Sequence, residues 1–325
     1  MKIMFYGFRH AHIEGLVERA KKNPRIEIAA CVEENDEARK GVEERLHLKF
    51  DERPYEQLLQ TDIDIVAIGC RYGERGQAII KALQAGKHVI ADKPICTSIE
   101  ELNEIERLAK EKNLKIACML DLRYLPSARA AKQAIAKNLY GTLRNVSFCG
   151  QHCLDYEHRP KWYYEQGMHG GTINDLGVHG VDLINWLTGE RIKEVLSART
   201  WNAYAKQEPH FEDCAIFMAE LTNGAGVLAD ISYSTPLGVG VLPTFWEFRL
   251  WFDKAMLTFN FKDSDVTVYE EGKQQPEILE GIVPTSDWLN DLLDEIESGG
   301  NAFTESVLCS SRETLLAQYK ATINK

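Results

Sequence analysis

Apolar residues in the first third of the chain alternate between short continuous runs and stretches with helical periodicity. Continuous apolar runs are typical of strands buried on both faces, and they lie at 2–6, 26–32, 63–70, 88–91 and 115–120. Stretches with a 3.6-residue apolar period lie between or after them, at 10–22, 36–46, 55–60, 75–85 and 98–112. Strands alternating with helices at this spacing predict a parallel, doubly wound sheet.

The pattern changes after residue 122. One helix is predicted at 126–137, followed by strand-like runs at 143–151, 192–202, 211–221, 226–233, 245–252 and 255–261. Because no helices separate the later runs, we expect a large, mostly antiparallel sheet. The chain then ends in helical stretches at 286–298 and 305–321. We therefore predict an α/β domain over 1–122 and an α+β domain over 123–325, with the last helix packing back on the first domain.

Composition narrows the class of partner. The 325 residues carry a net charge of −11 without a basic block, which argues against nucleic acid and anionic membranes as partners. No apolar run approaches the ~20 residues of a membrane span. Eight cysteines show no framework spacing, and Cys31, Cys70 and Cys118 lie in apolar strands. Such thiols are expected to be buried and reduced, so we expect a cytoplasmic protein.

A glycine pair and a polar helical segment, residues 170–182, form the first candidate for chemistry. Asp175 and His179 are four residues apart, so on a helix they share one face. A carboxylate beside an imidazole can hold a general acid or base in place. Gly177 and Gly180 cost helix stability, which indicates that another group approaches this helix closely. The alternative is a polar helix face with one hydrogen-bonded histidine.

The turn after the first strand is the second candidate. It reads GFRHAH over residues 7–12, so of the glycines of a G-x-G-x-x-G fingerprint it retains Gly7, while Arg9 and His12 replace the others. A helix N-terminus can still bind phosphate there, and Arg9 can add a charged contact. Glu33 follows the second strand, where a carboxylate accepts hydrogen bonds from a ribose and repels a 2′-phosphate. The pattern favours NAD over NADP; the alternative is a domain without nucleotide.

Three motifs carry a resemblance to a known family. Residues 85–94, AGKHVIADKP, are similar to A-G-K-H-V-x-x-E-K-P; residues 170–179 are similar to G-G-x-x-x-D-x-x-x-H; and residues 123–126 are similar to R-[FY]-x-P. Together they resemble the Gfo/Idh/MocA oxidoreductases. Two places depart from that family: the glycine fingerprint, and residues 71–75, RYGER, where the family usually has P-N-x-x-H.

The resemblance implies a Rossmann domain and hydride transfer between a nicotinamide and a hydroxyl-bearing carbon of a sugar, cyclitol or related polyol. Lys93 would stabilise charge on the reacting oxygen, His179 would act as general base, and Asp175 would orient the substrate or tune His179. A cis peptide is expected before Pro94. The expected cofactor-binding residues are Gly7, Phe8, Arg9, His10, Glu33, Cys70, Arg71, Asp92 and Lys93. The expected substrate-binding residues are Arg123, Tyr124, Arg159, Trp162 and His169.

Other hypotheses stay open at this point. The same residues would suit an enzyme that retains NAD and cleaves glycosides, and a non-enzymatic sensor of dinucleotide or sugar is a third reading. By residue type, His169, Asp175 and His179 also fit a metal, although the resemblance calls for none. Cys149, His152 and Cys153 lack a second pair at zinc-site spacing. The aromatic run 245–252 and the resemblance suggest a homodimer or homotetramer through the second sheet, unless one subunit covers both of its faces.

Overall fold

A computed structural model describes residues 1–323 and divides them into two compact units. The first unit comprises Met1–Met119, Glu165–Gly170 and Trp288–Leu308, and the second comprises most of the remaining chain, from Leu120 onward. The division between a cofactor-binding domain and a substrate-binding domain near residue 122 stays a prediction about function.

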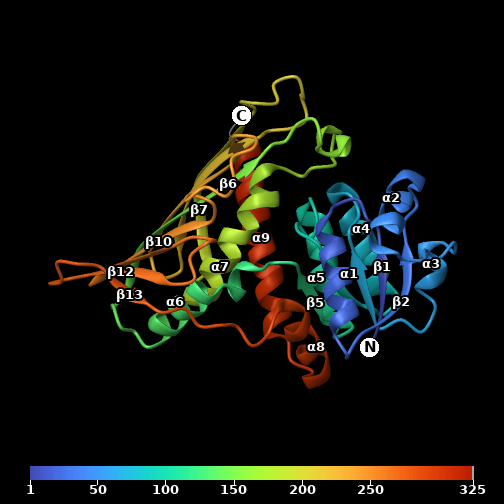
Figure 1. Ribbon diagram of the computed structural model, residues 1–325, viewed down its shortest axis with the longest axis horizontal. Coiled ribbons are helices and arrows are strands. Elements are labelled where there is room, and N and C mark those ends of the chain that lie inside the picture. Colours follow the sequence, from blue (N-terminus) through green and yellow to red (C-terminus); the bar gives the residue numbers. More distant parts are fainter. Residues whose placement is uncertain (324–325) are drawn as a thin grey trace. The chain divides into compact units, whose positions relative to one another are not determined.

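The first unit is built on a five-stranded sheet with the order β2-β1-β3-β4-β5, in which every neighbouring pair is parallel (Figure 1). Its strands are β1 (Lys2–Tyr6), β2 (Glu27–Val32), β3 (Ile65–Ile68), β4 (His88–Ala91) and β5 (Ile116–Cys118). The order places β1 beside β3, so the chain changes direction across the sheet between these two strands. In such sheets, ligands bind at the carboxyl ends of the strands at this point.

Helices connect these strands, and local capping explains where several of them begin. The Ser98 side chain accepts a hydrogen bond from the Glu101 amide, and Asn35 does the same for Ala38, which satisfies amides left free at a helix start. The helices that lie wholly in this unit are α1 (His12–Lys22), α2 (Asp36–Leu46), α3 (Tyr55–Leu58), α4 (Tyr72–Gln84), α5 (Ile99–Glu111) and α8 (Trp288–Ser298).

The second unit is built on an eight-stranded sheet with the order β13-β12-β11-β10-β6-β9-β8-β7 (Figure 1). All neighbouring pairs are antiparallel except β6 and β9, which run parallel. The strands are β6 (Leu143–Cys153), β7 (Ile192–Trp201), β8 (Cys214–Leu221), β9 (Gly226–Thr235), β10 (Glu247–Phe252), β11 (Ala255–Phe259), β12 (Val266–Glu270) and β13 (Glu277–Leu279).

Helices α6 (Pro126–Ala136) and α7 (Val178–Thr188) belong to this unit, and the long α9 (Ala302–Ile323) passes from the first unit into the second at Cys309. Within the second unit, α7 and α9 run side by side, and Asn185 donates a hydrogen bond to Glu313 across them at 2.7 Å (Figure 1). Helix α7 is preceded by a π-helical turn, Ile173–Gly177. Short 3₁₀ turns lie at Leu122–Tyr124 and Lys161–Tyr164.

The predicted fold class is confirmed: a parallel doubly wound sheet and a larger, mostly antiparallel sheet. Three features were not predicted, namely strands β12 and β13, the parallel β6–β9 pair and the π-helical turn. The buried thiols of Cys31, Cys70 and Cys118 are confirmed, and all eight cysteines are free. Within residues 1–323, no helix is both long and apolar enough to cross a membrane.

The predicted close approach to the helix of residues 178–188 comes from the protein's own core. A Cβ at Gly180 would lie 2.1 Å from a ring carbon of Phe148 in β6. That ring cannot withdraw easily, because Phe217 and Phe248 pack beside it with centroids 6.0 and 5.7 Å away. We therefore conclude that Gly180 is required for packing of α7 on the sheet.

Replacing Gly180 by alanine is expected to lower the free energy of unfolding by about 1–3 kcal/mol, because an added methyl overpacks a filled core. The control is Gly15 in α1, where an added Cβ meets nothing within 4 Å. Gly15→Ala should instead stabilise the protein by about 0.5–1 kcal/mol through helix propensity. Urea denaturation followed by circular dichroism measures both changes, and equal effects at the two positions would contradict this packing argument.

Candidate active site

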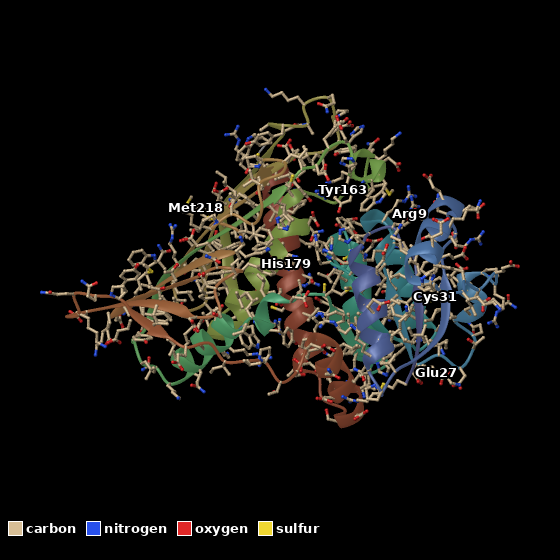
Figure 2. The ribbon with its side chains drawn as sticks, in the orientation of Figure 1. Arg9, Glu27, Cys31, Tyr163, His179 and Met218 are labelled. Carbon is tan, nitrogen blue, oxygen red and sulfur yellow. The ribbon has the colours of Figure 1, made fainter. Side chains whose placement is uncertain are left out.

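A cavity of about 230 Å³ lies in the first unit at the carboxyl ends of its strands. Gly7 follows β1 with φ +78°, and a Cβ there would lie 2.7 Å from the amide nitrogen of Cys70, which comes after β3. A glycine is thus needed for the tight turn and for the close approach of the two loops. Arg9 also lines the cavity and lies at the opposite end of the sheet from Glu27, which begins β2 (Figure 2). The cavity is lined by Tyr6, Gly7, Arg9, Glu33, Glu34, Asn35, Cys70, Arg71 and Glu74.

Glu33 links two of these loops. Its carboxylate accepts hydrogen bonds from the amides of Phe8 at 2.5 Å and Asn35 at 2.8 Å, and the residue is 6% exposed. Each carboxylate oxygen can accept more than one hydrogen bond, so Glu33 can still receive a ribose hydroxyl. The Phe8 side chain instead packs in the core against Phe5 and Phe50, so Phe8 offers a ligand its backbone only.

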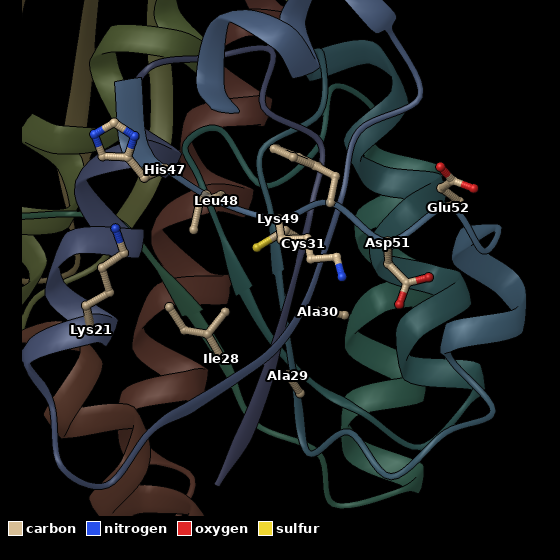
Figure 3. Close-up of a pocket in the computed structure, with 11 residues that line it drawn as sticks. Lys21, Ile28, Ala29, Ala30, Cys31, His47, Leu48, Lys49, Asp51 and Glu52 are labelled. Carbon is tan, nitrogen blue, oxygen red and sulfur yellow. The ribbon is translucent and has the colours of Figure 1, made fainter. Parts of the chain in front are cut away.

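A larger cavity of about 830 Å³ lies along the open edge of β2, beneath the segment 47–52. Figure 3 shows Lys21, His47 and Lys49 around it, with Cys31 on its strand side. One backbone hydrogen bond, from Asp51 to Cys31 at 2.8 Å, closes its end. It lies beside the strand instead of at the carboxyl ends, and none of the predicted site residues lines it. We therefore place the candidate site at the smaller cavity.

Beside the candidate cavity, Asp92 follows β4 and is fully buried. Its two oxygens contact Nδ1 of His10 at 2.5 Å and Nδ1 of His12 at 3.2 Å, and Arg75 Nη2 lies 3.4 Å away. Burial acts to raise the pKa of Asp92, but these neighbours hold it well below its usual range. Burial also lowers the pKa of His10 to about 4, so at neutral pH this imidazole is neutral beside an ionised carboxylate.

Lys93 comes directly after Asp92, and the peptide bond between Lys93 and Pro94 is cis, as predicted. The residue is 4% exposed, and its ammonium lies 5.7 Å from the ring centroid of Tyr72, the first residue of α4. The ring of Tyr72 also contacts that of His169 at 5.8 Å. His169 is brought there because the Gly73 amide donates to the Met168 carbonyl at 2.9 Å. Lys93 and His169 therefore both lie next to one buried tyrosine.

Asp175 and His179 lie in the second unit. Asp175 is in the π-helical turn and is 1% exposed, and its carboxylate accepts a short hydrogen bond from the Tyr233 hydroxyl of β9. Burial and then the charge of Asp175 raise the pKa of Tyr233 well above its usual value, so the phenol stays protonated as the donor. His179 is partly exposed near the start of α7 (Figure 2), and its ring lies 5.0 Å from that of Trp246.

Arg159 and Trp162, two predicted substrate-binding residues of this unit, make their contacts with other residues of the protein. Arg159 donates to the carbonyls of Leu154 and Cys153 at 2.7 and 2.6 Å, and its guanidinium lies over the rings of Tyr163 and Tyr233. Trp162 is 3% exposed and packs against Tyr163. Arg159 is thus oriented beside the partner of Asp175, while Trp162 is mainly a core residue.

Arg123 and Tyr124 have different surroundings. Arg123 is 4% exposed and forms a two-point ion pair with buried Asp182 of α7, with Nε 2.6 Å from a carboxylate oxygen. The ring of Tyr124 lies under the guanidinium of Arg129 at 5.1 Å. These contacts favour a structural role for Arg123, and its expected contact with substrate stays a prediction.

Sequence reasoning missed three residues that hold the candidate side chains, two in the first unit and one in the second. Tyr72 and Arg75 lie in the segment that departs from the family's P-N-x-x-H, and Tyr233 lies in an ordinary strand pattern. Arg75 is fully buried and donates to the carbonyls of Cys70, Asp92 and Pro94 at 2.7–3.0 Å. A charged residue inside an apolar helix pattern is the signal that could have identified Arg75. Tyr233 had no such signal.

Two family models match the chain. Residues 6–119 match the oxidoreductase family with an NAD-binding Rossmann fold, and residues 128–258 match the GFO/IDH/MocA C-terminal domain. Both matches come from the same group of oxidoreductases, and together they cover most of the chain.

Individual proteins give the same picture. The chain is 30% identical over 147 residues to levoglucosan dehydrogenase of Pseudarthrobacter phenanthrenivorans, covering 43% of this chain and 37% of that one. It is 27% identical over 191 residues to scyllo-inositol 2-dehydrogenase (NAD(+)) of Bacillus subtilis, covering 58% and 54%. The chain thus aligns with about half or less of these relatives. A solved levoglucosan dehydrogenase, in complex with NADH and levoglucosan, matches at TM-score 0.82 and 16% identity over 100% of this chain and 98% of that one, which shows the fold.

Proposed function

The chain belongs to the GFO/IDH/MocA oxidoreductase family, and from that premise we propose that it is an NAD-dependent dehydrogenase of a sugar, cyclitol or related polyol. The observation that carries the proposal is the cavity lined by Gly7, Arg9 and Glu33 together with the buried Lys93 that follows β4. Its relatives include dehydrogenases of levoglucosan and scyllo-inositol, which supports a hydroxylated ring compound as substrate.

The cavity fits the adenosine and phosphate end of a dinucleotide. Its floor is the backbone of the turn at Gly7, where a side chain would clash, and Arg9 supplies the positive charge that a pyrophosphate requires. Glu33 and Glu34 line the side where a ribose would lie, and two carboxylates there disfavour a 2′-phosphate. These contacts support NAD as the cofactor. Cys70 and Arg71 complete the lining. His10 and Asp92 do not line the cavity, and their contact with each other holds the turn after β1 against the end of β4.

In the proposed reaction, NAD accepts the hydride and the protein supplies charge and proton transfer. The Lys93 ammonium is proposed to hydrogen-bond the reacting oxygen and stabilise its developing negative charge. Burial at 4% exposure strengthens that interaction relative to water. Tyr72 limits where the ammonium can lie, because its ring packs beside the lysine.

His179 is proposed as the general base that takes the hydroxyl proton. His179 is partly exposed, whereas Asp175 is buried and accepts a hydrogen bond from Tyr233. We assign Asp175 to orienting the substrate or His179, because the hydrogen bond from Tyr233 stabilises its charged form. Arg159, aligned over the Tyr233 ring, is proposed to contact a substrate hydroxyl, as is His169.

The test is a screen of sugars, inositols and anhydrosugars with NAD, following NADH fluorescence. The proposal predicts steady NADH formation with at least one member and none with His179→Ala. Cleavage of a glycoside without net NADH formation would support the NAD-retaining alternative. Ligand binding with no turnover of any kind would support the sensor alternative and contradict the dehydrogenase.

We also propose that the exposed face of the large sheet is a homo-oligomer interface. Met218, Leu228 and Trp251 are each about half exposed, at 47%, 50% and 46%, and Met218 pairs with Leu228 across β8 and β9. Met218 lies on the side of the sheet away from α7, which carries His179 (Figure 2). Large apolar side chains exposed on several strands of one sheet are typical of protein–protein contacts.

Light scattering should therefore give the mass of a dimer or tetramer, and Met218→Glu should shift it toward the monomer, because a buried unpaired charge destabilises an interface. Leu139→Glu is the matched control, since Leu139 is 51% exposed in the turn before β6 and lies off this face. If the parent protein has the mass of a monomer, the proposed interface is contradicted. With all eight cysteines free, we further propose a reducing, cytoplasmic location.

A further inference from the structure

Two histidines and an aspartate converge at the carboxyl ends of β1 and β4. His10 lies in the turn after β1, His12 opens α1, and Asp92 follows β4. In the sheet, β3 separates β1 from β4, so the residues meet because parallel strands end at the same edge. One nitrogen or oxygen atom of each residue lies within 4.8 Å of the others. Within residues 1–323, no other group of three such side chains comes together this closely.

The spacing is close to that of a metal site. Both imidazoles point Nδ1 at the same carboxylate, each at a different oxygen, at 2.5 Å for His10 and 3.2 Å for His12. In a tetrahedral zinc site with bonds of about 2.0–2.1 Å, neighbouring ligand atoms lie ~3.3 Å apart. The His12–Asp92 spacing already matches, and His10 needs to withdraw by less than ~1 Å. In that exchange the proton of each neutral imidazole moves from Nδ1 to Nε2, and the lone pair on Nδ1 binds the metal.

Two neighbouring groups hold the Asp92 carboxylate in position. The Lys93 amide donates to one oxygen of Asp92 at 2.7 Å, and Arg75 lies 3.4 Å from the other. Arg75 is itself fixed by carbonyls on both sides of the cluster, those of Cys70 and Pro94, at 2.8 and 2.7 Å. Groups that orient a ligand in this way are a regular part of metal sites.

One side of the cluster is open. The Asp92 side chain is 0% exposed, that of His10 is 12% exposed and that of His12 is 46% exposed. Three protein ligands with solvent on one side are typical of metal sites that bind an exchangeable ligand. Two imidazoles with one carboxylate suit zinc and its neighbours in the first transition row, whereas magnesium and calcium prefer oxygen ligands.

We propose that His10, His12 and Asp92 form a binding site for a divalent transition metal of the zinc class, with an open position on the His12 side. The positive charges of Arg75 and Lys93 beside the carboxylate reduce the affinity, so the metal binds in exchange with the medium. The site adjoins Lys93, whose amide donates to Asp92 at 2.7 Å, but no step of the proposed dehydrogenase reaction uses the metal.

Calorimetric titration of chelator-treated protein with zinc chloride tests the site, with cobalt(II) absorbance as a second readout. We expect one equivalent of zinc and a cobalt spectrum typical of imidazole coordination. His12→Ala, at a half-exposed position that tolerates truncation, should weaken zinc binding by at least about tenfold, and His10→Ala should do the same. Circular dichroism checks that each variant is folded.

His158→Ala is the matched control. Nδ1 of His158 also faces a carboxylate, that of Asp155 at 2.8 Å, but the pair is exposed. Among residues 1–323, no third such side chain joins this pair. Zinc binding should be unchanged in this variant. The proposal is overturned if the parent protein takes up no zinc, or if His12→Ala and His10→Ala bind zinc as the parent does. In either case the cluster is a hydrogen-bonded anchor for the turn.

Discussion

Replacing Arg123 by methionine is expected to lower the free energy of unfolding by about 3–5 kcal/mol. The guanidinium is the two-point partner of Asp182, and both residues are almost fully buried, at 4% and 1% exposure. Methionine fills much of the volume but leaves the Asp182 carboxylate uncompensated in a dry environment. Urea denaturation followed by circular dichroism measures the loss.

The double variant Arg123→Met with Asp182→Leu is the control. It removes both charges and fills the space with apolar groups, so it should recover most of the lost stability. This design also separates two roles for Arg123. If its main role were to bind substrate, the single variant would raise KM and leave the free energy of unfolding within about 1 kcal/mol of the parent protein, which would contradict the structural assignment.

Replacing Lys93 by methionine is expected to reduce kcat about 10²–10³-fold, the usual effect of removing one group that stabilises charge in the transition state. Lys93 follows β4 and is 4% exposed, and its ammonium lies 5.7 Å from the ring centroid of Tyr72. NADH affinity and unfolding free energy should change little, because methionine preserves the aliphatic stem. Initial rates with the substrate found in the screen give the result.

Lys110→Met is the matched control, since Lys110 is exposed on α5 and its loss should leave kcat unchanged. Lys93→Arg keeps the charge but changes the hydrogen-bonding geometry, so it should restore part of the activity at most. A Lys93→Met enzyme with the parent's kcat would remove the lysine from the proposed chemistry.

The sequence predicted the two sheets well because hydrophobic periodicity is a local signal. The runs at 2–6 and 88–91 became β1 and β4 with the same bounds, and the helix at 36–46 became α2. What it could not predict is the partner of each polar residue. Asp92 meets His10 and His12 across 82 and 80 positions, and Asp175 meets Tyr233 across 58.

The same limit explains the two differences in the site. The spacing of Asp175 and His179 indicated one α-helical face, but Asp175 lies in a π-helical turn and is held by a strand residue. Gly177 and Gly180 indicated a close approach, but the groups that approach are core side chains, Ile231 at Gly177 and Phe148 at Gly180. Spacing reports which residues share a face, whereas tertiary packing decides what that face meets.

Calorimetric titration of the protein and of Glu33→Gln with NADH and with NADPH tests whether the first unit binds a dinucleotide. We expect micromolar NADH binding and NADPH binding weaker by about tenfold or more. The difference should be smaller in Glu33→Gln because one repelling charge is gone. Absorbance of the denatured protein shows whether cofactor is already bound as purified. If the protein binds neither nucleotide and releases no cofactor on denaturation, the proposed dinucleotide site is contradicted.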